Sequence, residues 1–151
     1  MGSTVPGVLD HLVGVVAALA DDRTLVLDGQ PAGLEGGVEA DYIALGYTPD
    51  PDVAAVESEE FTYFGPGFEE NYAVSCEVFA WTGDTEQKIP RDRAFTLLDL
   101  VTAAILDDPT LGGRVMSARL LSKGVIQHQT DRGSSAAIPF TIQVKALQTF
   151  P

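Results

Sequence analysis

The sequence is poor in cysteine throughout and poor in basic residues over its first half. Its single cysteine, Cys76, lies in an apolar stretch and excludes a disulfide within the chain, so we expect a buried core thiol in a fold that is stable in a reducing cytoplasm. Residues 1–70 contain fourteen Asp or Glu and one basic residue, Arg23, whereas residues 71–151 contain eight residues of each sign. The net charge of −13 therefore comes entirely from the first half. Such a field disfavours nucleic acid and anionic membranes and favours basic protein surfaces, or it simply keeps the protein soluble.

The sequence also lacks a hydrophobic run near its start that is long enough to cross a bilayer. The longest there is Val15–Ala20, far short of the roughly 20 residues that a spanning helix needs. Ala18–Ala20 resembles a signal-peptidase site, but the residues before it include Asp10 and no Lys or Arg. We therefore expect a protein that folds in the cytoplasm and has no membrane partner.

Motifs for catalysis, phosphate binding and metal binding are missing as well. There is no Gly-x-Ser-x-Gly sequence, and the glycine-rich segment Gly33–Gly37 carries no Lys. Neither His11 nor His128 has a Cys, His or Asp beside it at metal-ligand spacing. The pair Asp107–Asp108 could hold a hard cation, but Pro109 directly after it favours a helix stop, with both carboxylates past the last turn. The sequence therefore predicts no enzyme activity, no cofactor and no metal site.

Hydrophobic periodicity predicts a single α/β domain over residues 1–151. Segments with helical spacing of apolar residues are separated by segments with the period-2 alternation of strands. Two helices can cover only one face of a sheet of four or more strands, so we expect a mixed, mainly antiparallel sheet with both helices packed on one face. The predicted helices are residues 4–20 and 90–106, and the predicted strands are residues 24–28, 41–47, 60–64, 72–82, 115–121, 125–130 and 136–147.

The same alternation predicts which side chains form the core. In the strand over residues 72–82, the apolar face holds Tyr72, Val74, Cys76, Val78 and Ala80. A core shared by both helices and the sheet is predicted to contain Leu12, Val78, Leu98, Val101 and Phe140.

Two charged groups of opposite sign are candidate contact surfaces. An acidic segment is interleaved with aromatic residues, which suits a protein contact or, alternatively, an edge hairpin whose aromatics fold back on the core. Arg91 and Arg93 occupy the first turn of the second predicted helix, where a cation is unfavourable, so we expect each to pair with an acid of this subunit or of a neighbour. Arg114 and Arg119 extend the basic group. The acidic segment comprises Glu57, Glu59, Glu60, Phe61, Tyr63, Phe64, Phe68, Glu69 and Glu70.

Several runs together resemble the tail terminator proteins of long-tailed bacteriophages. Val74–Thr85 is similar to their central strand and turn, and Arg91–Leu106 with Asp108–Gly113 is similar to the helix and turn that follow. Val26–Pro31 and the Ala- and Val-rich first helix are similar to the opening of the family. The resemblance covers nearly the whole chain as an ordered pattern. None of these motifs is catalytic, and only their conjunction is specific.

The resemblance implies a mixed α/β fold and a structural role in the virion. Family members form a six-membered ring on the last ring of the tail tube, where they stop tube growth and present a surface for head joining. The expected partners are other copies of the chain in a hexameric ring, the tail tube protein and a head-completion or connector protein, while DNA passes through the channel without specific binding. The expected location is the tail–head junction of the virion, after assembly in the host cytoplasm.

Other functions stay open at this point. Other neck or tail-completion proteins and the cap protein of a contractile injection system are close alternatives. An acidic DNA-mimic inhibitor belongs to a different class. Against the mimic, half of the chain is charge-balanced, and the acids are expected in Gly- and Pro-rich loops instead of along a regular element.

Overall fold

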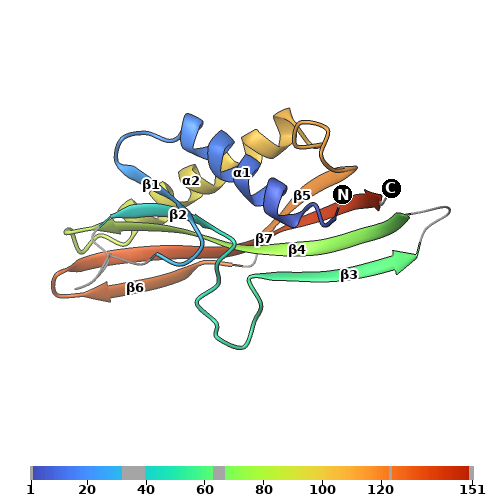
Figure 1. Cartoon of the computed structure of the whole chain (residues 1–151). Helices are drawn as coiled ribbons and strands as arrows, with labels where there is room; N and C mark the ends of the chain where they lie inside the picture. Colours follow the sequence, from blue (N-terminus) through green and yellow to red (C-terminus); the bar gives the residue numbers. More distant parts are fainter. Residues whose placement is uncertain (1, 32–39, 63–66, 123, 150–151) are drawn as a thin grey trace.

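The chain folds into two helices and seven strands (Figure 1). A computed structural model describes residues 2–31, 40–62, 67–122 and 124–149, and the side chains of residues 59–62, 122, 148 and 149 lie outside that description. The helices are α1 (Val5–Leu19) and α2 (Lys88–Asp107). The strands are β1 (Thr24–Asp28), β2 (Asp41–Leu45), β3 (Val56–Thr62), β4 (Gly67–Thr82), β5 (Ser117–Ser122), β6 (Ile126–Thr130) and β7 (Gly133–Thr149).

All seven strands belong to one sheet in the order β1-β2-β4-β7-β5. Two further strands lie beside this series. The strand β3 pairs with β4 on the same side as β2, and β6 pairs with β7 on the same side as β5. The β1–β2 pair is parallel and the others are antiparallel. The prediction of a mixed, mainly antiparallel sheet is confirmed.

The two longest strands form the spine of the molecule. The 16 residues of β4 pair with β7 along their whole length, from Gly67 opposite Thr149 to Thr82 opposite Ser134. At about 3.3 Å per residue this ladder is roughly 50 Å long. At one end, Gly133 has a φ of +154°, and a Cβ there would lie 2.1 Å from the carbonyl oxygen of Thr82. Only glycine permits this close approach where β7 begins.

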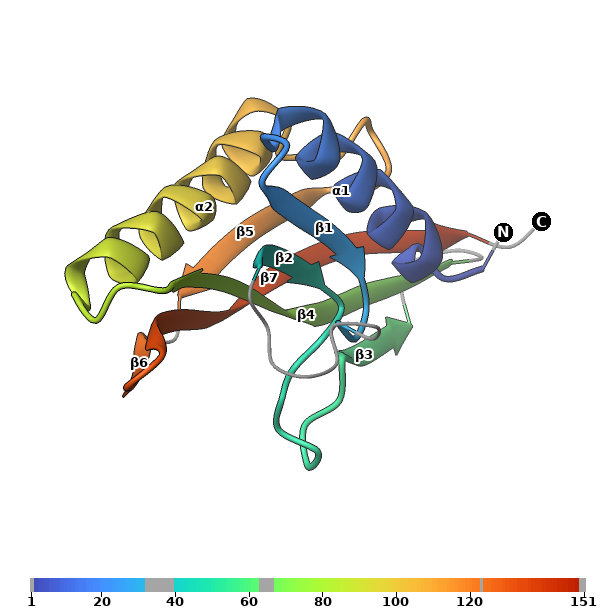
Figure 2. The ribbon, with the colours of Figure 1, turned by 90° about the vertical axis from the view of Figure 1, so that its left-hand side faces the viewer.

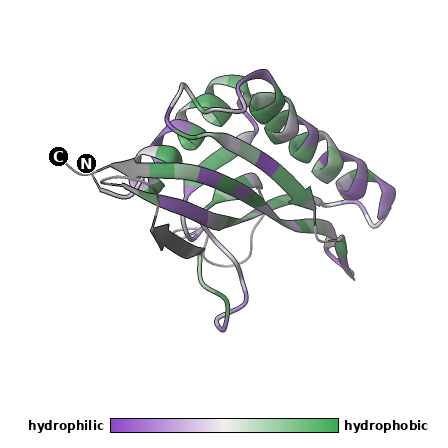
Figure 3. Cartoon of the chain, turned by 90° about the vertical axis from the view of Figure 1, so that its right-hand side faces the viewer, coloured by the Kyte–Doolittle hydropathy of each residue, from purple (hydrophilic) through white to green (hydrophobic). Residues whose placement is uncertain are grey.

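Both helices lie on the same face of the sheet (Figures 1 and 2). The helix α2 packs on β4, β7 and β5, while α1 packs on β1 and β2 and against α2. Hydrophobic stretches alternate with hydrophilic ones along the ribbon (Figure 3), as expected for elements that bury one side. The other face of the sheet has no helix among the described residues.

The core lies between the helix layer and the sheet, where the sequence predicted it. The predicted apolar face of β4 is buried, with no side chain of that set more than 3% exposed. The five residues predicted to share one core all belong to the same buried cluster. They are Leu12, Val78, Leu98, Val101 and Phe140.

The β3–β4 hairpin is longer than predicted. The strand β3 begins at Val56 instead of Glu60, and β4 begins at Gly67 instead of Tyr72. Glutamates have low strand propensity, which hid these extensions, but a strand at the edge of a sheet tolerates charged side chains. The predicted end of the first of these strands, Phe64, lies outside the described residues, as does Tyr63.

Candidate interaction surfaces

The candidate contact residues of the acidic segment divide between the surface and the interior. Glu57 is exposed on β3 and Phe68 is 37% exposed on β4. Glu69 is partly buried and its Oε1 lies 3.0 Å from Nζ of Lys145 on β7. For Glu59, Glu60 and Phe61, the structure describes the backbone of β3 and not the side chains.

Glu70, the last residue of the acidic segment, is buried and has hydrogen-bond partners inside its own subunit. Its side chain is 1% exposed and faces the start of α1. Glu70 accepts hydrogen bonds from the hydroxyl of Ser3 (2.5 Å) and from both the backbone N–H (3.0 Å) and the hydroxyl (2.7 Å) of Thr4. The carboxylate thus satisfies donors at the helix N-terminus, where a negative charge is favourable. The side chain of Thr4, the predicted cap, makes no capping bond of its own.

Tyr72 completes this buried polar group. Its hydroxyl lies 2.8 Å from the hydroxyl of Thr4, and burial raises the pKa of Tyr72 to about 12. Residues 66 to 68 positions apart in sequence are therefore joined through one carboxylate and two hydroxyls. This network attaches the start of α1 to β4.

Arg93 pairs with acids of its own subunit. Its Nε donates to Asp41 Oδ2 at 2.9 Å, and one terminal nitrogen donates to Asp21 Oδ2 at 2.8 Å and to the hydroxyl of Thr24 at 2.8 Å. Asp41 is 4% exposed and also accepts the backbone N–H of Trp81 at 3.1 Å. Hydrogen bonds from Thr24 and Arg93 lower the pKa of Asp21. Arg93 therefore ties α2 to β1 and β2.

The three other candidate arginines are more accessible and do not form one patch. Arg91 lies in the first turn of α2, with Nε 3.8 Å from Asp92, its acidic partner in the same chain. Arg119 is exposed on β5 and donates to Gln143 Oε1 at 3.4 Å. Arg114 is exposed and follows the C-terminal end of α2, whereas Arg91 lies at the N-terminal end of that helix. The structure therefore separates the basic residues that the sequence grouped.

Arg114 and His11 link α1 to the turn after α2. Arg114 donates to Nδ1 of His11 at 3.2 Å, and because arginine has no acceptor, the imidazole hydrogen is assigned to Nε2. Nε2 in turn lies 3.4 Å from Oδ2 of Asp108. Asp108 also accepts the N–H of Gly112 at 2.8 Å, so it closes the turn that ends α2. As predicted, the helix stops here, but Asp107 is its last residue and not a residue past it.

The reactive groups singled out in the sequence are held in structural positions. The hydroxyl of Thr110 donates to Asp108 Oδ1 at 3.4 Å and accepts the N–H of Gly113 at 3.3 Å. Cys76 is 1% exposed, and burial raises the pKa of its thiol to about 12, which keeps it protonated. In the described part of the chain, no group of three or more His, Cys, Asp or Glu residues is placed to hold a metal ion.

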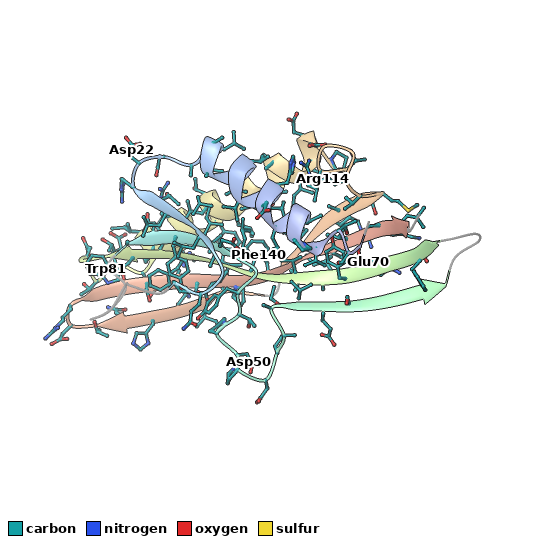
Figure 4. The ribbon with its side chains drawn as sticks, in the orientation of Figure 1. Asp22, Asp50, Glu70, Trp81, Arg114 and Phe140 are labelled. Carbon is teal, nitrogen blue, oxygen red and sulfur yellow. The ribbon has the colours of Figure 1, made fainter. Side chains whose placement is uncertain are left out.

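A groove crosses the face of the sheet that the helices leave uncovered. Its volume is about 550 Å³, and the loop between β2 and β3, with Asp50 near its tip (Figure 4), forms one wall. The ends of β5 and β6 form the other wall, with Leu121 45% exposed and Ile126 57% exposed. Val53 on the loop is 44% exposed. The sequence predictions missed this groove because it depends on which loops meet across the sheet.

Charge is segregated across the sheet. Residues 1–70 supply α1, β1, β2, β3 and the first residues of β4, which together form one flank of the molecule. Residues 71–151 supply α2, β5, β6 and β7 on the other flank. Counted over the described residues alone, the formal net charge is −11 for the first group and −1 for the second. The described acidic excess therefore belongs to the elements of the first flank.

Comparison with protein-family models finds no match, and comparison with curated protein sequences finds none either. Across the described residues, no helix combines the length and apolar character needed to cross a membrane.

Proposed function

We propose that the chain is a structural subunit that closes the end of a bacteriophage tail tube as a ring. The ring ends polymerisation of the tube and provides the surface to which the head is joined. The observation that carries the proposal is the segregation of charge across the sheet, because a subunit with two unlike flanks is suited to head-to-tail contacts. The resemblance of residues 74–113 to tail terminators supports it independently of that charge.

The acidic flank also suits a channel that DNA crosses. A flank with a large excess of acids repels phosphates, so DNA could slide past it without being held. The networks around Glu70, Asp41 and His11 hold elements together, and the proposed role requires a stable shape and no chemical step. Other neck or tail-completion proteins and the cap of a contractile injection system fit the same features.

An acidic DNA-mimic inhibitor is the second candidate, and one observation favours it. The acids were expected in loops, but positions 57, 59 and 60 lie on the regular strand β3, so that expectation is wrong. Against the mimic, Glu69 is paired with Lys145, and Glu70 is buried. A mimic would compete with DNA for a basic DNA-binding protein, and a ring subunit would not.

Electron microscopy of particles made without this gene tests the proposal. We expect tails without a defined stopping length and heads without attached tails. Complementation with the intact gene should restore joined tails of uniform length. Tails of normal length that are joined to heads in the absence of the gene would rule out the terminator role.

A further inference from the structure

Four strands of the sheet, β1, β3, β5 and β6, have an edge that no described strand covers, and of these β3 and β6 pair with opposite ends of the β4–β7 ladder. Among the described residues, β3 pairs only with β4, and β6 pairs only with β7. Each therefore presents a row of backbone N–H and C=O groups along its outer edge. Such a row is a template for pairing with a strand of another chain.

The edge of β6 has none of the usual protection against pairing. Proteins commonly guard an edge strand with Lys, Pro or another charged residue. The sequence of β6, Ile126–Thr130, contains no charged residue and no Pro. All five residues are exposed, with Ile126 57% exposed, and Val125 just before the strand is 38% exposed. An exposed strand of this kind is suited to contact with a partner.

The edge of β3 has the opposite character. Glutamates stand at positions 57, 59 and 60 of this seven-residue strand, so β3 of one copy repels β3 of another. The residues that flank β6 lack this excess of acids, because residues 123–132 contain Lys123, Arg132 and one Asp. Electrostatics therefore favours β3 against the β6 edge over β3 against itself.

The positions of the two edges suit a repeating assembly. The strands β3 and β6 lie on opposite sides of the β4–β7 spine, and they pair with opposite ends of it. In Figure 1 the β3–β4 and β6–β7 hairpins accordingly extend in opposite directions. A contact between unlike edges leaves one β3 and one β6 free at the two ends of any open assembly, so copies can be added until a ring closes.

We propose that β6 of one copy pairs with β3 of the next, which joins the sheets of neighbouring subunits. The inference rests on the proposed ring and names its subunit interface. The occupant of each free edge is thus a second copy of this chain. Backbone hydrogen bonds supply the contact, and the glutamates of β3 disfavour pairing of β3 with itself, which leaves the uncharged β6 edge as its partner.

A matched pair of charge variants tests the interface. Q127E/Q129E places two acids on the exposed β6 edge, and Q127K/Q129K places two bases at the same positions. Sedimentation of the full chain at low salt should show association weakened by about tenfold or more in the Glu variant. The Lys variant should associate at least as strongly as the unchanged protein. Because both variants disturb the strand equally, equal loss in the two would overturn the proposal.

Cross-linking tests the same contact when association is weak. Cys76 is buried, so cysteines introduced at exposed positions can be joined selectively by a bismaleimide. The double variant S58C/Q127C, with one cysteine on each edge, should give a ladder of trimers and larger species. Each single variant should give few dimers, because it has no cysteine on the opposite edge for the cross-linker to reach. A ladder from either single variant is impossible, and efficient dimers from one of them would show like-edge pairing and overturn the proposal.

The two proposals can fail separately. If charge variants and cross-linking show no β3–β6 contact while particles lacking the gene still have unfinished tails, the interface is wrong and the terminator role stands. If the ladder forms while such particles have normal tails, the interface stands and the terminator role falls.

Discussion

At the scale of single residues, the acids are divided by burial. Glu70, Asp41 and Glu77 are each 5% exposed or less, and each has a partner inside the subunit. Glu70 binds the start of α1, Asp41 binds Arg93, and Glu77 accepts the hydroxyl of Tyr42. Buried polar groups need such partners, because an unpaired one costs the free energy of its lost hydration.

Removing the Glu70 carboxylate should destabilise the fold. Glu70→Ala leaves the donors of Ser3 and Thr4 without their acceptor and the helix N-terminus without its negative charge. We expect the free energy of unfolding to fall by about 1.5–3 kcal/mol, the range for hydrogen bonds to charged groups. Denaturant unfolding measures the loss. Glu57→Ala on the exposed part of β3 is the matched control, and an equal small effect in both variants would contradict the buried role.

Replacing Glu77 should make stability less sensitive to pH. Burial raises the pKa of Glu77 above its ordinary value of 4.5, and the hydrogen bond from Tyr42 acts in the other direction. With the folded pKa above the unfolded one, ionisation of Glu77 costs folded-state stability at pH values above about 4.5. Glu77→Gln keeps an acceptor for Tyr42 and removes that cost.

Glu77→Gln should therefore be more stable than the unchanged protein near neutral pH. The difference should shrink towards zero as the pH falls below about 4.5, where the carboxyl is protonated in both states. Unfolding midpoints across this pH range provide the measurement, with Glu86→Gln at an exposed position as the control. A gain that does not depend on pH would mean that the ionisation of Glu77 is not its cause.

The sequence could not distinguish Glu70 from Glu57. Both belong to one acidic segment, and strand alternation is too weak a signal among glutamates to assign either to the interior. The difference depends on Ser3 and Thr4, which reach Glu70 only once α1 has packed on the sheet. Arg93 was easier to predict, because a cation in the first turn of a helix already indicates an acidic partner nearby.

At the scale of elements, apolar periodicity predicted the helices and the buried strand face, whereas charged residues concealed the full length of two strands. Both helices and the buried face of β4 follow the pattern of apolar residues. The extra length of β3 and of the start of β4 does not, because glutamates interrupt the apolar alternation there. The groove and the uncovered edges depend on the order of strands in the sheet, which no local pattern specifies.

The helix α2 offers a direct test of its buried face. Leu98 is 6% exposed in the core, and Leu106 two turns later is 75% exposed. Leu98→Ala should cost about 2–5 kcal/mol of unfolding free energy through lost burial and a residual cavity. Leu106→Ala, the matched control, should change it by less than about 0.5 kcal/mol. A Leu98→Ala loss below about 1 kcal/mol in denaturant unfolding would show that this face is not packed in the core.

At the scale of the whole molecule, the distribution of charge matters more than any single pair. Fourteen acids and one base lie in residues 1–70, and Arg93, which belongs to the balanced half, is engaged with Asp21 and Asp41. The accessible arginines are separated along the molecule. A binding surface for duplex DNA needs several cations aligned along the phosphates.

The chain should therefore have negligible affinity for duplex DNA at physiological salt. Fluorescence anisotropy of a labelled duplex should stay unchanged up to protein concentrations of tens of micromolar, roughly the middle of the range of dissociation constants for non-specific binding. Lowering the salt should not induce binding, because repulsion is then less screened. A micromolar complex that weakens as salt rises would contradict the charge argument.

The position of β7 in the sheet has a consequence for how the protein is made. This strand pairs with β4, β5 and β6 and contributes Phe140 and Ile142 to the core, yet it follows every other described element in chain order. A ribosome therefore has to synthesise almost the entire domain before its central ladder can form. Until then, β4 keeps an open edge and the helices lack much of the surface that covers them. We expect nascent chains shorter than about 140 residues to remain unfolded and to engage chaperones, with folding completed in one late step.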